Sequence, residues 1–254
     1  MKKKILELFR ANSQQNRKSI AVLIDPDDVD ESGLVQVLDA GIENKVDYFF
    51  VGGSLLTTGE VSSVVEFIKS YTDIPCILFP GNAIQICPSA DAILFLSLIS
   101  GRNPELLIGQ HVVAAPVLKR SRLEVIPTGY MLIHSGRPTS VSYMSNTQPI
   151  PNDKPSLAVS TAIAGEMLGL KCMYMDAGSG AQEPVPAKMI RQVKKSLEGP
   201  LIIGGGLNST YKIKEALDAG ADIVVVGNGV QKNLSLLTEV SEVIQFYNEE
   251  LNVN

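Results

Sequence analysis

The chain has 254 residues, of which 45% are hydrophobic and 19% are charged, and its formal net charge is −5. This length suits one (β/α)8 barrel, and the composition is ordinary for a globular protein with a large apolar core. The negative charge, together with the lack of a basic stripe interleaved with aromatic residues, argues against a nucleic-acid partner.

Residues 1–18 predict a helix that packs outside the barrel, with a contact at a membrane surface as the less favoured alternative. No apolar run reaches the ~18 residues that span a bilayer. Cys76, Cys87 and Cys172 are widely spaced and form no CxxC pair, which is typical of reduced, buried thiols. We therefore expect a cytoplasmic protein with one domain over residues 1–254.

In chain order, apolar runs bounded by turn residues alternate with amphipathic segments. Continuous apolar runs are typical of strands that are buried on both faces of a parallel sheet, and eight of them favour a closed (β/α)8 TIM barrel over an open sheet. The predicted strands are 19–24, 46–51, 75–79, 92–96, either 112–117 or 125–133, 171–175, 201–203 and 223–226. The predicted helices are 32–44, 61–71, 156–168, 187–197, 209–219 and 234–247.

Two stretches interrupt this alternation. Residues 79–92 contain Pro80-Gly81 and Pro88 and have no amphipathic pattern, so we expect an irregular segment where the third helix would stand. Residues 137–155 are rich in Ser, Thr, Asn and Pro. A connection of this length after a late strand indicates a lid or a substrate loop.

Active sites of such barrels lie at the carboxyl ends of the strands, where Asp25 follows the first strand and Ser54 the second. A carboxylate beside a hydroxyl could supply part of a Mg2+ shell, although Asp25 could instead be a turn or cap residue. Asp27 and Asp28 are expected to cap the first barrel helix. Asp176 ends the sixth strand before a glycine turn, where a functional role is favoured.

Three glycine-rich turns follow the last three strands. Absent side chains let backbone N–H groups and helix N-termini approach an anion closely, so three such turns indicate a phosphate site rather than tight corners alone. Their glycines and neighbours are Gly178-Ser179-Gly180, Gly205-Gly206 and Gly227-Asn228.

Together, these motifs resemble the geranylgeranylglyceryl phosphate synthase family over residues 19–229. The resemblance implies a modified barrel whose third helix is replaced by an irregular segment, and a Mg2+-dependent ether bond between sn-glycerol 1-phosphate and a polyprenyl diphosphate. The motifs are Asp25-Pro26-Asp27, Gly52-Gly53-Ser54, Phe79-Pro80-Gly81, Tyr174-Met175-Asp176-Ala177-Gly178-Ser179-Gly180-Ala181, Gly204-Gly205-Gly206 and Gly227-Asn228.

Carried over by resemblance, Asp25 and Ser54 are the metal positions, and Tyr174 and Asp176 are catalytic. The glycerol phosphate site then comprises Tyr174, Met175, Asp176, Ala177, Gly178, Ser179, Gly180, Gly205, Gly206, Gly227 and Asn228. Asp176 stands where the family usually has glutamate. Leu23 stands where one branch has lysine, so the chain is similar to the second branch.

We therefore expect a prenyltransferase for geranylgeranyl diphosphate, whose tail lies along residues 79–98. Self-association and a peripheral membrane contact for the lipid product are also expected. The alternatives are the same reaction with a longer prenyl chain, a metal-independent sugar-phosphate isomerase that uses Asp25 and Asp176, and a non-catalytic phosphate-binding barrel.

Overall fold

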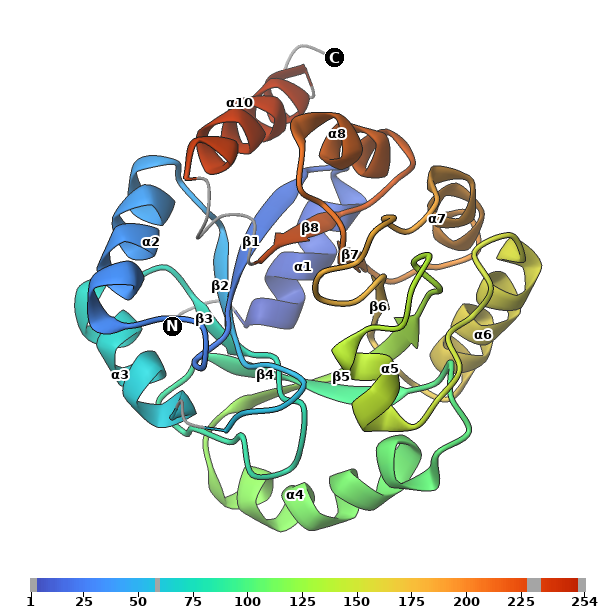
Figure 1. Ribbon diagram of the computed structural model, residues 1–254, viewed down its shortest axis with the longest axis horizontal. Helices are drawn as coiled ribbons and strands as arrows, with labels where there is room; N and C mark the ends of the chain where they lie inside the picture. The colour runs from blue at the N-terminus through green and yellow to red at the C-terminus, as the bar shows by residue number, and fades with distance from the viewer. Residues whose placement is uncertain (1–3, 58–59, 228–233, 251–254) are drawn as a thin grey trace.

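The computed structural model describes residues 4–57, 60–227 and 234–250, in which eight parallel strands close into a barrel in chain order (Figure 1). Strand β8 closes on β1, with Ser19 opposite Ile223. The strands are β1 Ser19–Ile24, β2 Tyr48–Val51, β3 Cys76–Leu78, β4 Ala92–Leu98, β5 Glu124–Leu132, β6 Cys172–Asp176, β7 Leu201–Gly204 and β8 Ile223–Val226. The predicted fold class is confirmed.

Most helices form a ring around the strands (Figure 1). The helices are α1 Ile5–Gln14, α2 Glu31–Glu43, α3 Val61–Tyr71, the π-helical turn η1 Glu105–Gly109, α4 Gln110–Arg120, α5 Ser140–Ser145, α6 Pro155–Met167, α7 Ala187–Lys194, α8 Thr210–Asp218 and α10 Ser235–Glu250.

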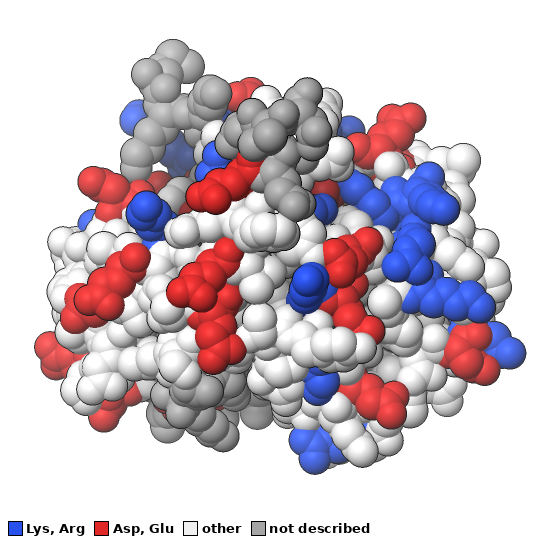
Figure 2. Space-filling view, turned by 90° about the horizontal axis from the view of Figure 1, so that it is seen from above, with Lys and Arg blue, Asp and Glu red and all other residues white. Residues whose placement is uncertain are grey.

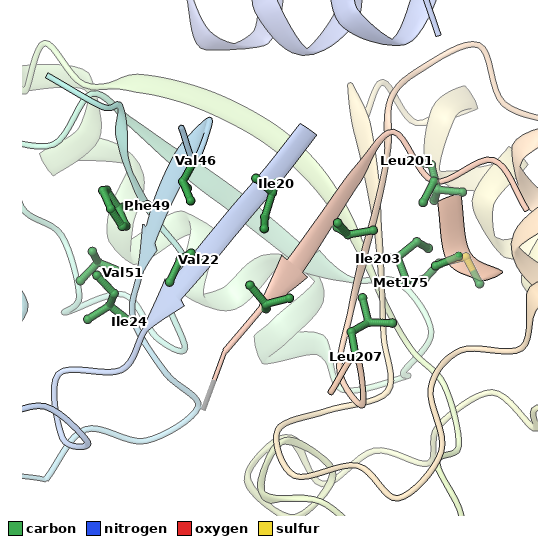
Figure 3. Packing of buried hydrophobic residues seen from close by; sticks show 14 of the residues in the cluster. Ile20, Val22, Ile24, Val46, Phe49, Val51, Met175, Leu201, Ile203 and Leu207 are labelled. Carbon is green, nitrogen blue, oxygen red and sulfur yellow. The ribbon is translucent and has the colours of Figure 1, made fainter. Parts of the chain in front are cut away.

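Alternation along each strand divides the core into two layers. Ile20, Val22 and Ile24 lie on the outer face of β1 and pack in the layer between sheet and helices (Figure 3). Ala21 belongs to the second cluster, which fills the barrel interior together with aromatic residues such as Phe50. Because both faces are covered, these strands are apolar at nearly every position.

Helix α1 closes the floor of the barrel. The ring of Phe9 meets that of Tyr48 edge to face, with 5.0 Å between centroids. The Glu124 carboxylate accepts hydrogen bonds from the backbone N–H of Ile5 at 2.7 Å and of Leu6 at 3.0 Å, which satisfies two free amides of the first helical turn. The other end of the barrel is therefore the place for a site. The assignment of residues 1–254 to one domain stays a prediction.

An irregular segment, residues 79–91, takes the place of a helix after β3, as predicted. It passes very close to the turn that follows β2. A Cβ atom on Gly52 would lie 2.1 Å from the carbonyl oxygen of Phe79, and one on Gly81 would lie 2.3 Å from that of Gly53. The glycines at these positions allow the two backbones to meet beside the mouth of the barrel.

Three predictions need correction or completion. The fifth strand is β5, whereas residues 112–117 lie in α4, where Val112 and Val113 face outward and are 65% exposed. Neither Asp27 nor Asp28 caps α2, because that helix begins only at Glu31 and its N-cap is Asp30, which accepts a 2.7 Å hydrogen bond from Gly33. The long connection contains a short helix, α5.

Acidic and basic side chains are interspersed over much of the face drawn in Figure 2, with one denser group of Lys and Arg at its right-hand side. Within the described ranges, the helices are all too short or too polar to cross a bilayer.

Candidate active site

Parallel closure brings the ends of β1, β2, β6, β7 and β8 to one mouth (Figure 1). Asp25 follows β1, Ser54 lies beyond β2, and Asp176 is the last residue of β6. Gly205-Gly206 follow β7 and Gly227 follows β8. Asn228 lies outside the described residues. The mouth therefore brings together the carboxylates and glycine turns that the sequence predicts.

Asp176 is a buried carboxylate, only 7% exposed, held between two donors. The Tyr130 hydroxyl donates to Oδ2 at 2.5 Å, and the backbone N–H of Gly178 donates to Oδ1 at 2.7 Å. Burial raises the pKa of Asp176, while these two hydrogen bonds act to lower it. A positioned carboxylate with a raised pKa is suited to accept a proton from a bound hydroxyl.

Three aromatic rings pack against one another beside this carboxylate. Phe79 stacks on Tyr174 with 5.0 Å between centroids, and Tyr130 lies 5.5 Å from Tyr174. Burial and the charge of Asp176 raise the pKa values of Tyr130 and Tyr174 well above the ordinary tyrosine value. Both phenols therefore remain protonated, so the Tyr130 hydroxyl acts as a donor.

The glycine turns after β6 and β7 interlock. Gly178, Gly180, Gly205 and Gly206 have φ angles of +91°, +67°, +77° and +69°. A Cβ atom on Gly205 would lie 2.5 Å from both the Asp176 Oδ1 and the Gly178 nitrogen. The left-handed conformation and the close approach both require glycine there.

The predicted pocket residues differ in their access to the mouth. Ser179 and Gly180 are exposed, Gly205, Gly206 and Gly227 are half-buried, and Ala177 and Gly178 are buried. Met175 stands apart, because its side chain packs in the layer between sheet and helices (Figure 3). Only the backbone of Met175 could therefore contribute to a ligand site.

At Gly227 the contacts with the described residues are loose. Among those residues, the nearest atom that a Cβ there would meet is on Leu23, at 3.8 Å. Packing against the described part of the chain therefore does not explain glycine at this position, in contrast to Gly205.

The Asp25 carboxylate is suited to bind a hard cation whose other ligands come mostly from the substrate. This carboxylate is half-buried, and burial raises its pKa, while the backbone N–H of Asp27 donates to Oδ1 at 3.1 Å. A Cβ on Gly53 would lie 2.5 Å from Oδ2, so glycine leaves space for that oxygen. The part of the chain that the structure describes offers no cluster of three His, Cys, Asp or Glu. One carboxylate plus substrate oxygens is a common Mg2+ arrangement.

An apolar cleft of about 340 Å³ opens beside these groups. It runs from the Ser54 turn along the irregular segment toward α4 and α5 and includes the predicted wall between residues 79 and 98. Its lining is Gly53, Ser54, Leu55, Phe79, Pro80, Gly81, Asn82, Ala83, Ile86, Ile93, Phe95, Leu96, Leu98, Asn103, Glu105, Leu106, Gln110, His111, Ala114, Tyr130, Val141, Met144 and Ser145.

A larger hollow of about 1010 Å³ lies at the opposite end, between α1 and α4. Lys119 and Arg122 line it, together with residues of α1, the helix that closes the floor of the barrel. The smaller cleft is lined by Ser54 and by Tyr130, the hydrogen-bond partner of Asp176, and is therefore the candidate site.

Sequence reasoning missed three residues at the mouth. Tyr130 lies two positions before the end of β5, but its side chain reaches Asp176 at the end of the neighbouring strand, β6. Thr139 packs against Gly178, and Arg137 donates a hydrogen bond to the Gly180 carbonyl. The inward alternation of β5 was a usable signal for Tyr130. The other two lie in a connection without periodicity.

Glycine turns, a buried carboxylate and an adjoining apolar cleft are typical of a (β/α)8-barrel enzyme with its site at the mouth. The profile of the PcrB family matches residues 13–244, and the chain therefore belongs to the PcrB family.

Named relatives agree with this assignment. The chain is 51% identical over 246 residues to the geranylgeranylglyceryl phosphate synthase of Spirosoma linguale, covering 97% of this chain and 99% of that protein. The synthase of the same name from Chitinophaga pinensis is 50% identical over 244 residues, covering 96% and 97%.

A solved structure is similar throughout. The (S)-3-O-geranylgeranylglyceryl phosphate synthase of Thermoplasma acidophilum, in complex with its substrate sn-glycerol-1-phosphate, superimposes with a TM-score of 0.90 at 30% identity, covering 96% of this chain and 100% of that one. The resemblance that the motifs predicted is confirmed, and the chain is an enzyme, a prenyltransferase.

Proposed function

We propose that this enzyme forms the ether bond between sn-glycerol 1-phosphate and geranylgeranyl diphosphate in a Mg2+-dependent reaction. The observation that carries the proposal is the position of Asp176. Its carboxylate accepts hydrogen bonds from Gly178, in a glycine turn that suits a phosphate, and from Tyr130, which lines the apolar cleft that suits an isoprenoid tail. A residue at this junction can act on a hydroxyl that faces both halves.

The phosphate end of the glycerol substrate is assigned to the turns after β6, β7 and β8. Ser179, Gly180, Gly205 and Gly206 are accessible there, and four of the turn glycines have left-handed φ angles that direct backbone amides in ways other residues rarely allow. Anchoring the phosphate leaves the terminal hydroxyl near Asp176.

The prenyl tail is assigned to the cleft, with its diphosphate at the Asp25 end. Ser54 lines this end of the cleft, and the Asp25 carboxylate follows the adjacent strand. Mg2+ held by Asp25 and Ser54 would supply neutralisation of the charge that develops on the leaving diphosphate. Holding both substrates in one geometry removes much of the entropic barrier.

In the proposed reaction, the terminal oxygen of glycerol phosphate bonds to C1 of the prenyl chain. The bond from C1 to the diphosphate oxygen breaks, and its electron pair leaves with diphosphate. Asp176 takes up the hydroxyl proton, and Tyr130 keeps the carboxylate oriented through its 2.5 Å hydrogen bond. Phe79 and Tyr130 line the cleft, and their rings would border the carbon where positive charge develops.

We also propose partners and a location for the enzyme. We assign it to the cytoplasm, with peripheral contact to a membrane that receives the lipid product. Self-association is proposed through the outer face of η1 and α4, where Ile108, Val112 and Val113 are 61–65% exposed.

The test is an assay with radiolabelled sn-glycerol 1-phosphate and prenyl diphosphates of several lengths, with and without EDTA. The expected result is an ether-linked product that is formed fastest with the C20 substrate and is abolished by EDTA. Faster reaction with a longer prenyl diphosphate would show that the substrate is longer than C20. Metal-independent isomerisation of a sugar phosphate would show that the enzyme is an isomerase instead of a prenyltransferase. Binding without turnover would indicate a non-catalytic barrel.

The role of Asp176 is tested by Asp176→Ala, which should abolish turnover and leave prenyl diphosphate binding intact. Asp153→Ala removes a carboxylate that is 69% exposed on the connection after β5 and serves as the matched control. Near-normal turnover of Asp176→Ala would contradict the assignment.

A further inference from the structure

The connection after β5 folds back over the glycine turn that follows β6. The backbone N–H of Glu183 donates to the carbonyl of Ser135 at 3.2 Å. Thr139 packs so closely on Gly178 that a Cβ there would lie 2.6 Å from the threonine Oγ1. Residues 135–139 are thus fixed against the turn to which the phosphate is assigned.

This arrangement places a cation at that turn. A terminal nitrogen of the Arg137 guanidinium, Nη2, donates to the carbonyl of Gly180, and it lies 3.5 Å from the position that a Cβ of Gly180 would occupy. Arg137 is exposed, and none of the ion pairs recorded among the described residues involves it. A guanidinium carries five N–H donors, so its bond to Gly180 leaves others for a ligand.

A cation at this position would stabilise a phosphate bound in the pocket. The described residues of the turns after β6 and β7 offer a phosphate neutral groups, namely backbone amides and the Ser179 hydroxyl, and the nearby Asp176 carboxylate repels a dianion when ionised. Lys212 is a second cation in this region. However, its Nζ donates at 2.9 Å to the side chain of Asn208, which lies between Gly206 and the start of α8.

We propose that Arg137 binds the phosphate of the acceptor substrate and selects phosphorylated glycerol over glycerol. The Gly180 carbonyl anchors the guanidinium over the turn after β6, with the remaining donors directed to phosphate oxygens. This inference rests on the proposed function. It adds a substrate-binding residue from the connection after β5, which otherwise contributes lining to the prenyl cleft through α5.

Three substitutions separate charge from anchoring. Arg137→Lys keeps the charge, Arg137→Gln keeps an amide donor for the Gly180 carbonyl without charge, and Arg137→Met removes both. Lys154→Met removes a cation that is 59% exposed on the same connection and serves as the matched control. Lys212→Met tests the other cation.

The expected result is a rise of about tenfold or more in KM for sn-glycerol 1-phosphate in the Gln and Met variants, the factor typical of one charge-assisted hydrogen bond. In these variants, kcat and the KM for the prenyl diphosphate should each change less than twofold. Arg137→Lys should recover most of the lost affinity for sn-glycerol 1-phosphate. Calorimetric titration of each variant with sn-glycerol 1-phosphate alone should give the same ranking of Kd.

Other outcomes overturn the inference. Unchanged KM and Kd in Arg137→Gln and Arg137→Met would do so, as would a loss confined to Lys212→Met. Recovery by Gln but not by Lys would show that the side chain only anchors the loop. The titration separates this inference from the proposed reaction. Wild-type protein that binds glycerol phosphate without forming ether product refutes the reaction alone, whereas wild-type protein that does not bind it refutes both.

Discussion

Replacing Gly205 by alanine tests whether the interlocked turns are as tight as the structure indicates. A left-handed residue with a Cβ costs about 1–2 kcal/mol, and Gly205 has a φ of +77°. The new Cβ would also lie 2.5 Å from the Asp176 Oδ1 and the Gly178 nitrogen, and overpacking of this kind costs about 1–3 kcal/mol. The expected loss in free energy of unfolding is therefore about 2–5 kcal/mol.

The chain provides a matched control in Gly169. Its φ is +93°, but a Cβ there would meet no atom within 4 Å. Gly169→Ala should therefore cost only the conformational part, about 1–2 kcal/mol. Urea denaturation of both variants measures the difference, provided that the slope of free energy against denaturant is unchanged.

Activity provides a second readout for the same pair. Relief of the clash at Gly205 must move either Asp176 or the turn after β6, and a displacement of about 1 Å at a reacting group costs about a hundredfold in rate. Gly169→Ala should retain wild-type turnover. If Gly205→Ala is no less stable than Gly169→Ala and turns over normally, the reasoning about interlocked turns is refuted.

Three further predictions concern the carboxylates. Tyr130→Phe removes a hydrogen bond that favours ionised Asp176, so the pKa of Asp176 should rise further and the acid limb of the pH–turnover profile should move to higher pH; an unmoved limb would contradict this. Asp176→Asn should abolish turnover. At pH values above the raised pKa of Asp176, where the wild type holds an ionised buried carboxylate, the variant should have a larger free energy of unfolding than the wild type. This difference should vanish as the pH falls below the pKa of Asp176 in the unfolded chain, and urea denaturation at several pH values measures it. Glu124→Ala should cost about 1–2 kcal/mol of stability by freeing two amides of α1, with both KM values unchanged; a change in KM without loss of stability would argue against a purely structural role.

The barrel was predictable from sequence because a parallel sheet covered on both faces needs continuous apolar runs. The fifth strand was ambiguous for the same reason, since residues 112–117 are as apolar as a buried strand. In the structure, Val112 and Val113 face outward from α4, so their apolar character reflects an exposed helix face and not the core.

The site was predictable where it follows the strand ends, as with Asp25 and Asp176. Tyr130 was missed because a long side chain acts some distance from its own backbone position. Its strand register, opposite Tyr174, is what lets the hydroxyl reach Asp176. Arg137 was missed because its place depends on how an irregular connection folds back, which no local pattern encodes.

The irregular segment in place of the third helix puts the proposed binding of the prenyl tail and that of the phosphate on different parts of the barrel. The barrel interior is filled by side chains such as Phe50 and Leu94, so a linear tail cannot thread through it. The cleft instead borders the irregular segment, and its walls come largely from that segment, α4 and α5. In the proposed reaction, the tail that the enzyme accepts can change over evolution by replacement of these walls. The floor under α1 and the glycine turns for phosphate would stay as they are.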